Sequence, residues 1–410
     1  MSTEGDAPSA LEIWTAGAAQ AAVGQVLQDA NLAQLRTIQV DMQALDSVAE
    51  AVVAQVRRYY PDLQVPPASV WRWLETGGID RWAVLADYRG FSSPQDLLRV
   101  AGDLALLVSA AASQVPAGWV FEDGYTEHLF GGRAGVALAV LNMMRSGSFS
   151  ADPADPLRVD AHALIRLDVE EVASGLRLDH DVFPGWAEAL TAHLHRFGEA
   201  VGMRPDVFEA DEAARPGNLL VQIGNRNARG EIAIDEVFAR VAESFAPLWP
   251  GGAGVGDIIL GDVWRADQPL GPAMIPFHLP ALEMTNSLIE PFAWSGLNVS
   301  GFSELPAPSD AAHALLLQDH GVIRVISDQV PPDPVTGMIE VRMVTSSLWS
   351  RLADRVREKL AAPEEVLPNA CVLEGSRMAA VPVAQENPEG FQKLAKIMNP
   401  GSVFWLPFGA

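Results

Sequence analysis

Residues 93–108 read SPQDLLRVAGDLALLV, and this stretch has the pattern of one long helix. Ser93 suits the position that caps a first turn, and Pro94 fits the first helical position because the N–H groups there have no helical partner. The apolar side chains then recur every three or four residues, at Leu97, Leu98, Val100, Leu104, Leu107 and Val108. That spacing places them on one face, so the stretch predicts a helix packed against a core.

The same spacing of apolar side chains dominates the rest of the chain. It predicts further helices within residues 10–60, near Arg133–Met144, within Ala161–Phe197 and over Trp349–Leu360. Four shorter apolar runs are interpreted as strands: Ala314–Leu317, Val322–Ile326, Met338–Val344 and Val403–Phe408. We therefore predict an α+β fold that is predominantly helical, with a small mixed or antiparallel sheet in the C-terminal half.

The domain organisation is less sharply marked. The segment Phe149–Asp160 is rich in prolines and acids and is interpreted as a bridge. We expect an N-terminal helical region over residues 1–115 and, over residues 116–410, a helical core with a small sheet that carries the functional site. The alternative is one compact domain, since the chain has no repeat, heptad pattern or low-complexity linker.

Composition limits the classes of partner. The chain has 410 residues and a formal net charge of −24, so binding to nucleic-acid phosphates is not expected. The longest apolar runs, Leu104–Ala112 and Val136–Met144, are shorter than the roughly twenty residues of a membrane span. Cys371 is the single cysteine, which excludes a disulfide within the chain and suits a reducing compartment. No signal peptide is evident, so we expect a cytoplasmic protein that binds neither nucleic acid nor membranes.

One segment concentrates polar side chains within apolar sequence. It contains an acid, an indole, a guanidinium, an imidazole and a second acid, namely Asp262, Trp264, Arg265, His278 and Glu290. Charges are costly to bury unless they are paired or used, so the segment predicts a pocket. The alternatives are that Asp262 caps a turn or pairs with Arg265, and that Trp264 and His278 belong to the core. The run before it, Ile258–Leu260, is expected to be buried.

The sequence Leu279–Glu290 predicts a helix with a polar stripe. The stripe comprises Glu283, Asn286 or Ser287, and Glu290, whose spacing places them on one face. Pro291 is expected to end or bend the helix at Glu290. A carboxyl group at such an end, beside aromatic residues, would have a raised pKa and would suit a general acid or base. A solvent-exposed stripe is the alternative.

Other charged residues are candidates for binding an anionic group, namely Arg72, Arg133, Arg265, Glu340 and Arg342. Glu340 and Arg342 would share one face of the expected strand Met338–Val344. They are interpreted either as a structural ion pair or as an anion clamp for a phosphate.

Metal and nucleotide motifs are weak. Gly252, Gly254 and Gly256 fit neither a dinucleotide fingerprint nor a P-loop, so a loop is expected there. His193 and His195 would point to different faces of a helix without a third ligand at helical spacing. We therefore expect no metal and no cofactor.

From about Val65 to its end, the chain resembles the uracil catabolism protein four family, a bacterial and fungal family of unknown function linked to pyrimidine breakdown. The motifs that carry the resemblance are Val65-Pro66-Pro67 with Trp71-Arg72, Gly77-Gly78-x-Asp80-Arg81, Gly147-x-Phe149-Ser150, Gly261-Asp262-Val263-Trp264, Pro276-Phe277-His278, Ser287-Leu288-Ile289-Glu290-Pro291, Val372-Leu373-Glu374-Gly375 and Gly401-Ser402-Val403-Phe404. The chain departs from the family pattern at Arg133-Ala134-Gly135-Val136 and at Leu305–Ala312, which indicates a divergent member.

The resemblance implies a place in a pathway that opens the uracil ring and forms a ribosylurea-type intermediate. Our hypothesis for the step is hydrolysis of the N-glycosidic bond of a ribosylurea phosphate or a related nucleotide fragment. Asp262 would be the carboxylate near the anomeric carbon, Glu290 the acid/base partner and His278 the residue that orients or shuttles a proton. The substrate-binding candidates are Trp264, Arg265, Arg72, Arg133, Glu340, Arg342 and Glu374, and the expected partner is a small phosphorylated ribosyl substrate. The alternative function is a non-catalytic or altered-specificity paralogue that binds a nucleotide-derived ligand or a partner enzyme. A metal-dependent amidohydrolase is a third reading that lacks a ligand set.

Overall fold

The computed structural model describes residues 9–210, 213–227, 230–249, 251–266, 273–326 and 334–399, without the side chains of residues 29–30. Contacts divide the chain into two compact units. The first comprises residues 1–65, 234–282 and 301–402, and the second comprises residues 66–233, 283–300 and 403–410. Each unit combines segments that are distant in sequence, whereas the division into residues 1–115 and 116–410 follows chain order and stays a prediction.

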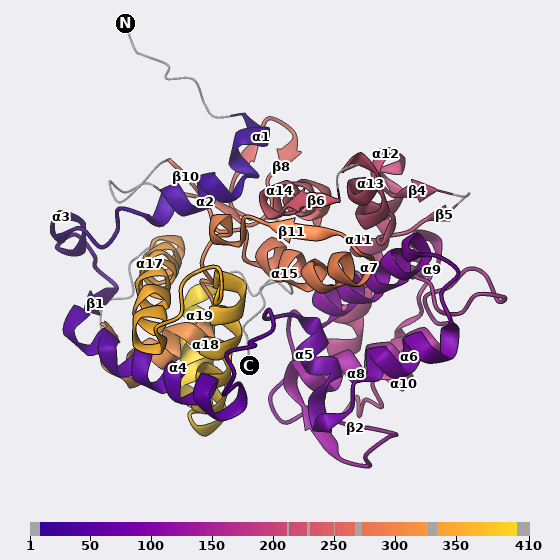
Figure 1. Cartoon of the computed structure of the whole chain (residues 1–410), viewed down its shortest axis with the longest axis horizontal. Helices are drawn as coiled ribbons and strands as arrows, with labels where there is room; N and C mark the ends of the chain where they lie inside the picture. The colour runs from indigo at the N-terminus through magenta and orange to yellow at the C-terminus, as the bar shows by residue number, and fades with distance from the viewer. Residues whose placement is uncertain are drawn as a thin grey trace, which may run out of the picture. The chain divides into compact units, whose positions relative to one another are not determined.

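In the first unit, α4, α16, α17, α18 and α19 pack against one another (Figure 1). Its helices are α1 (Ala10–Ile13), α2 (Ala16–Val23), α3 (Asp29–Leu32), α4 (Leu45–Tyr59), α14 (Ile234–Phe245), α16 (Ala311–Asp319), α17 (Pro334–Leu360), α18 (Asn369–Glu386) and α19 (Pro388–Met398), with 3-10 turns η1 (Met42–Ala44), η3 (Ala246–Leu248) and η4 (Phe302–Glu304). Its strands are β1 (Ile38–Val40), β7 (Gly254–Val255), β8 (Ile258–Ile259), β9 (Val263–Arg265), β10 (Met274–Pro276) and β12 (Ile323–Val325). The strands form antiparallel pairs β1–β12, β7–β8 and β9–β10.

In the second unit, α7 packs against α8, α11 and α13. Its helices are α5 (Val70–Leu74), α6 (Arg81–Arg89), α7 (Pro94–Ala111), α8 (Gly132–Arg145), α9 (Ala161–Ile165), α10 (Val169–Gly175), α11 (Trp186–Gly202), α12 (Pro205–Phe208) and α13 (Asn218–Arg226), with the 3-10 turn η2 (Thr76–Gly78). Its strands form antiparallel pairs β2 (Val120–Glu122) with β3 (Leu129–Gly131) and β4 (Glu209–Ala210) with β5 (Ala213–Ala214), and a parallel pair β6 (Glu231–Ala233) with β11 (Asn298–Ser300). Helix α15 (Leu279–Trp294) begins in the first unit and continues in the second.

The predicted fold class is confirmed, because the described chain is mostly helical with small two-stranded ladders. The helix predicted from residues 93–108 is α7, and Ser93 accepts the hydrogen bond of the Asp96 amide as its cap. Val322–Ile326 contains strand β12, as predicted. Val403–Phe408 lies outside the described residues.

Two predicted strands are wrong. Met338–Val344 lies within α17, and Ala314–Leu317 lies within α16. Both segments are buried all round, so neither shows the one-sided pattern that separates a helix from a strand. Glu340 and Arg342 are therefore helical, and their expected shared strand face does not exist. The expected burial of Ile258–Leu260 is confirmed for Leu260, which is fully buried, and wrong for Ile258 and Ile259, which are 47% and 46% exposed.

Pro291 lies inside α15 and does not end it. A proline has no N–H, so it leaves the carbonyl oxygen four residues earlier, that of Ser287, without its helical donor. The indole Nε1 of Trp71 donates to this oxygen at 2.8 Å and replaces the missing bond. A contact from another element thus allows the helix to continue for a further turn.

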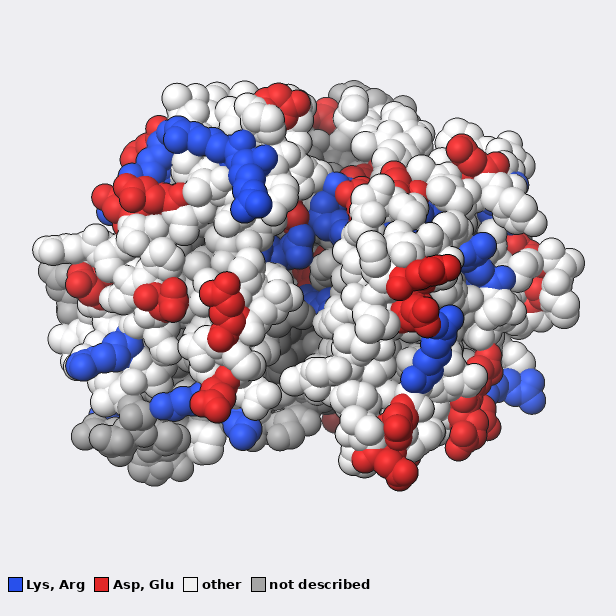
Figure 2. Space-filling view, turned by 90° about the horizontal axis from the view of Figure 1, so that it is seen from below, with Lys and Arg blue, Asp and Glu red and all other residues white. Residues whose placement is uncertain are grey.

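Acidic and basic side chains are interspersed on the face shown in Figure 2. Among the described residues, no helix is both long and apolar enough to span a membrane.

Candidate functional site

Asp262 lies at the centre of a buried polar cluster in the first unit. Its Oδ1 accepts hydrogen bonds from Arg342 Nη1 at 2.7 Å and from Trp264 Nε1 at 2.9 Å. Its Oδ2 accepts from Arg342 Nη2 at 2.6 Å and from the amide of Leu279, the first residue of α15, at 3.0 Å. Burial alone would raise the pKa of Asp262, but the Arg342 charge and these hydrogen bonds hold that pKa below its usual value.

Arg342 is fully buried, and its guanidinium is satisfied on several sides. Besides Asp262, it donates from Nη2 to Ser309 Oγ at 3.1 Å. Its guanidinium carbon also stands 4.0 Å from the centroid of the Phe277 ring. These contacts identify the partner of Arg342 as Asp262, and not Glu340 as one reading of the sequence suggested.

His278 belongs to the same cluster, with a strained backbone. Its φ of 48° lies in the left-handed region, which residues other than glycine rarely adopt. Its Nε2 stands 3.0 Å from the carbonyl oxygen of Ile13, and burial lowers the pKa of its imidazole. The ring is therefore neutral near pH 7 and anchors α1 to the start of α15.

The remaining candidate residues of the first unit contact different partners and do not share one binding site. Arg265 is exposed and donates to the carbonyl oxygen of Gly254 at 3.3 Å. Glu340 is buried, and its Oε2 accepts from the amides of Arg36 and Thr37 at 2.9 and 2.7 Å. Glu374 is buried and pairs with Arg377 at 2.7 Å. Their expected roles in substrate binding stay predictions.

In the second unit, Glu290 is bound by residues of the loop before α5 and of α5 itself. Its Oε1 accepts from Arg72 Nη2 at 2.5 Å, and its Oε2 accepts from Ser69 Oγ at 2.8 Å. The Arg72 guanidinium also pairs with Glu75 at 2.9 Å. The side chain of Glu290 is 17% exposed, so it is neither in bulk solvent nor sealed in the core.

Glu283, a second carboxylate of α15, lies on the same helix face as Glu290 and in the same unit. Glu283 pairs with both terminal nitrogens of Arg133, of which Nη1 stands at 2.8 Å. Arg133 Nε donates to the carbonyl oxygen of Ala112 at 3.0 Å, and its guanidinium lies 4.2 Å from the Trp73 ring centroid. The predicted polar face of α15 therefore exists, and Arg72 of α5 and Arg133 of α8 form ion pairs with its two carboxylates.

Asn286 lies between the two carboxylates on this face. It is almost fully buried, and its Oδ1 accepts no hydrogen bond from any described residue. Buried polar atoms are nearly always satisfied, so an unsatisfied amide oxygen marks a place for a donor from a ligand or water. We call Glu283, Asn286 and Glu290 with Arg72 and Arg133 the α15 cluster.

The candidates thus fall into two groups. Asp262, Trp264, His278 and Arg342 meet in the first unit, and the α15 cluster forms in the second. Asp262 and Glu290 belong to different units, so the expected convergence of their carboxyl groups stays a prediction.

Sequence reasoning missed a buried network in the first unit. Asp310 Oδ2 lies 2.6 Å from His313 Nδ1, and His313 Nε2 lies 2.9 Å from Ser376 Oγ. The order of contacts resembles a hydrolase triad, but Ser376 is fully buried and accepts from Trp349 Nε1 at 3.0 Å. This fits a structural network. Its sequence signal was Asp310 three residues before His313, the spacing of a helix cap.

The described residues contain no group of three or more histidine, cysteine, aspartate or glutamate side chains that could hold a metal ion. His193 is buried, and burial followed by the charge of Arg196 lowers its pKa to about 3. His195 contacts the carbonyl oxygen of Leu167 at 2.8 Å.

The chain is similar to a protein family and to a protein of known sequence. Residues 13–404 match a family described as "Protein of unknown function (DUF1688)". The chain is also 26% identical over 356 residues to Protein urg3 of Schizosaccharomyces pombe, in an alignment that covers 82% of this chain and 83% of that protein. Both side-chain groups lie within the matched range.

Proposed function

The chain belongs to the DUF1688 family of proteins of unknown function, and from its side chains we propose that it hydrolyses the N-glycosidic bond of a small phosphorylated ribosyl compound formed in uracil breakdown. The link to uracil rests on the resemblance of the motifs around Asp262, His278 and Glu290 to the uracil catabolism protein four family. The chemistry rests on the α15 cluster.

The observation that carries the proposal is the pair of carboxylates on one face of α15. Glu283 and Glu290 are seven residues apart, which is about 10 Å along a helix axis. Hydrolases that invert at the sugar carbon hold two carboxyl groups roughly 6.5–9.5 Å apart, because a water molecule must fit beside the sugar. The axial separation of the two residues lies close to this range, which supports such an arrangement.

The reaction needs stabilisation of a positively charged sugar ring and two proton transfers. The water oxygen bonds to the anomeric carbon while the bond between that carbon and the leaving nitrogen breaks. Glu290, with both oxygens oriented by Arg72 and Ser69, accepts a proton from the water. Glu283 donates a proton to the leaving nitrogen, and both carboxyl groups return to their starting states by exchange with solvent.

Arg133 is the proposed phosphate ligand. Its guanidinium presents two terminal nitrogens to Glu283, a geometry that also suits a phosphate. A phosphate that binds Arg133 draws this cation away from Glu283, and a carboxyl group without a cationic partner is protonated more readily. Substrate binding thereby favours the acid form that the leaving group needs.

The contacts of Asp262 account for a buried carboxylate at this position without a catalytic role. It is fully buried, and both oxygens already accept two hydrogen bonds each. We therefore propose that Asp262 and His278 position the start of α15. A direct catalytic role for Asp262 is the alternative.

The test is incubation of the full chain with uridine monophosphate and its ring-opened derivatives, followed by detection of ribose phosphate and urea. Glu290→Gln should lower the rate about a hundredfold or more. Glu75→Gln is the matched control, because Glu75 pairs with the same arginine but is 38% exposed, and its rate should stay within about threefold of the parent. Absence of product, or an unchanged rate for Glu290→Gln, overturns the proposal.

A binding-only function is the second candidate, and one packing detail favours it. The family pattern has Arg-Ser-Glu-Gly where this chain has Arg133-Ala134-Gly135-Val136. A Cβ atom at Gly135 would collide with the carbonyl oxygen of Phe130 and meet Trp119 at 3.0 Å, so an acid cannot occupy this position without rearrangement. Stabilisation of the chain by ribose phosphate without any turnover would support this candidate.

A further inference from the structure

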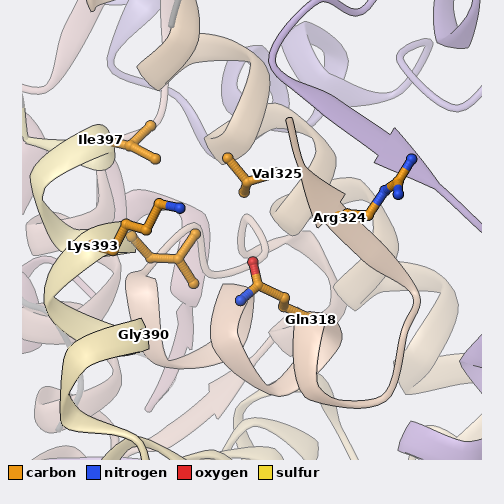
Figure 3. Close-up of a pocket in the computed structure, with 7 residues that line it drawn as sticks. Gln318, Arg324, Val325, Gly390, Lys393 and Ile397 are labelled. Atoms are coloured by element: carbon orange, nitrogen blue, oxygen red, sulfur yellow. The ribbon is translucent and has the colours of Figure 1, made fainter. Parts of the chain in front are cut away.

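A separate pocket of about 320 Å³ lies in the first unit, between α16, β12 and α19. Figure 3 shows this open pocket in close-up, with Lys393 and Gln318 directed toward its space. Its volume is at the lower end of the range of small-molecule sites, about 300–1,000 Å³, so it suits a small ligand. All its described lining residues belong to one unit.

Two cations line the pocket, and neither has an acidic partner among the described residues, but only Lys393 is directed toward the space in Figure 3. Lys393 makes no ion pair or hydrogen bond with the described residues through its ammonium group, and the side-chain amide of Gln318 makes none either. Arg324 also lines the pocket, but its guanidinium donates to Gln39 Oε1, from Nε at 3.2 Å, and is directed away from the space in Figure 3. No acidic residue is among the described lining residues.

The remaining side chains that line the pocket are aliphatic. Leu394 and Ile397 follow Lys393 on α19 at one and four residues, and Val325 approaches from β12. Leu394 is buried, while Val325 and Ile397 are partly exposed and so have apolar surface left to cover. A ligand that fills the pocket therefore meets a cation, an amide and aliphatic side chains.

We propose that this pocket binds a small carboxylate with a short aliphatic chain. The carboxylate accepts hydrogen bonds from Lys393 Nζ and from the Gln318 amide, and the chain packs on Val325 and Ile397. A single ammonium group matches one negative charge, whereas proteins favour arginine forks or several cations for a phosphate dianion.

The test is calorimetric titration of the full chain with hexanoate, acetate, hexanol and inorganic phosphate. Hexanoate should bind at least tenfold more tightly than each of the other three, because only hexanoate supplies both the charge and the chain. Equal affinity for acetate or phosphate overturns the carboxylate assignment. Absence of heat and of any thermal shift with hexanoate overturns the site itself.

Matched variants of α19 locate the binding. Lys393→Met should weaken hexanoate binding about ten- to a hundredfold, since it removes a charge-assisted hydrogen bond. Lys393 and Lys396 are both exposed lysines of α19, but Lys396 does not line the pocket, so Lys396→Met should leave the affinity unchanged. Equal losses in both variants would mean that hexanoate responds only to overall charge, which contradicts the proposal.

Discussion

Replacement of Asp262 by asparagine removes one charge from a pair whose two members are fully buried. The asparagine keeps an amide oxygen that can accept from Trp264 or Leu279, but its NH2 group then faces the donors of Arg342. A buried guanidinium without its counter-ion costs about 3–5 kcal/mol. This is a large share of the roughly 5–15 kcal/mol that stabilises a typical domain, so we expect Asp262→Asn to be close to unfolding before its activity is considered.

The assay is urea unfolding of the full chain, followed by tryptophan fluorescence, with hydrogen exchange at the Leu279 amide as a local measure. The second measure is needed because a chain of two units need not unfold in one step. Asp354→Asn is the control, since it breaks a pair with Arg357 in which Asp354 is 68% exposed, and it should cost less than about 1 kcal/mol. The double variant Asp262→Asn, Arg342→Met should recover part of the loss. An unfolding free energy for Asp262→Asn within about 1 kcal/mol of the parent would refute the reasoning.

Three further predictions concern the pH dependence of stability at Asp262 and His193 and the hydrogen bond of the Trp71 indole. The pKa of Asp262 in the folded chain lies below its ordinary value of 3.8, so the stability that the ionised carboxylate contributes is complete above pH 3.8 and is lost as the pH falls through the folded pKa. Acid unfolding of Asp262→Asn should lack this loss, and an acid unfolding curve identical to that of the parent would contradict the prediction. The pKa of His193 falls from 6.5 to about 3 on folding, so the free energy of unfolding decreases by up to about 1.4 kcal/mol for each pH unit below pH 6.5. The free energy of unfolding of His193→Gln should depend less steeply on pH between pH 6.5 and 3. An equally steep dependence in this variant would count against burial of His193 as the cause. Trp71→Phe leaves the Ser287 carbonyl beside Pro291 without a donor and should cost about 1–3 kcal/mol in the same urea assay, whereas no loss would mean that the helix does not need this bond.

Local signals predicted the elements whose boundaries they mark. Helix α7 begins at its predicted cap, Ser93, and α8 covers the predicted apolar run, because a capping residue and one-sided periodicity each act within a few residues. Helix α17 was missed over Met338–Val344, since it is buried on all sides there and carries no periodicity. The continuation of α15 past Pro291 could not be predicted, because the compensating donor, Trp71, comes from a position 216 residues away.

The candidate site shows the same limit. The spacing of Glu283 and Glu290 predicted a shared helix face, and the structure has it with an arginine at each acid. The partner of Asp262 was not predicted, because Arg342 lies 80 residues further along the chain and sat in an expected strand. Sequence reasoning found the polar residues that need partners, but the pairing depends on how distant helices pack.

The most direct test of the proposed chemistry is chemical rescue of Glu290→Ala. Its small side chain leaves space for formate beside Arg72, and formate can take over a proton transfer that a glutamate performs. The measured quantity is the rate at which ribose phosphate is released from a ribosylurea phosphate, with and without formate. We predict a rate at least about a hundredfold below the parent that rises with formate concentration. A rate equal to the parent without formate, or a low rate that formate does not change, would contradict the account.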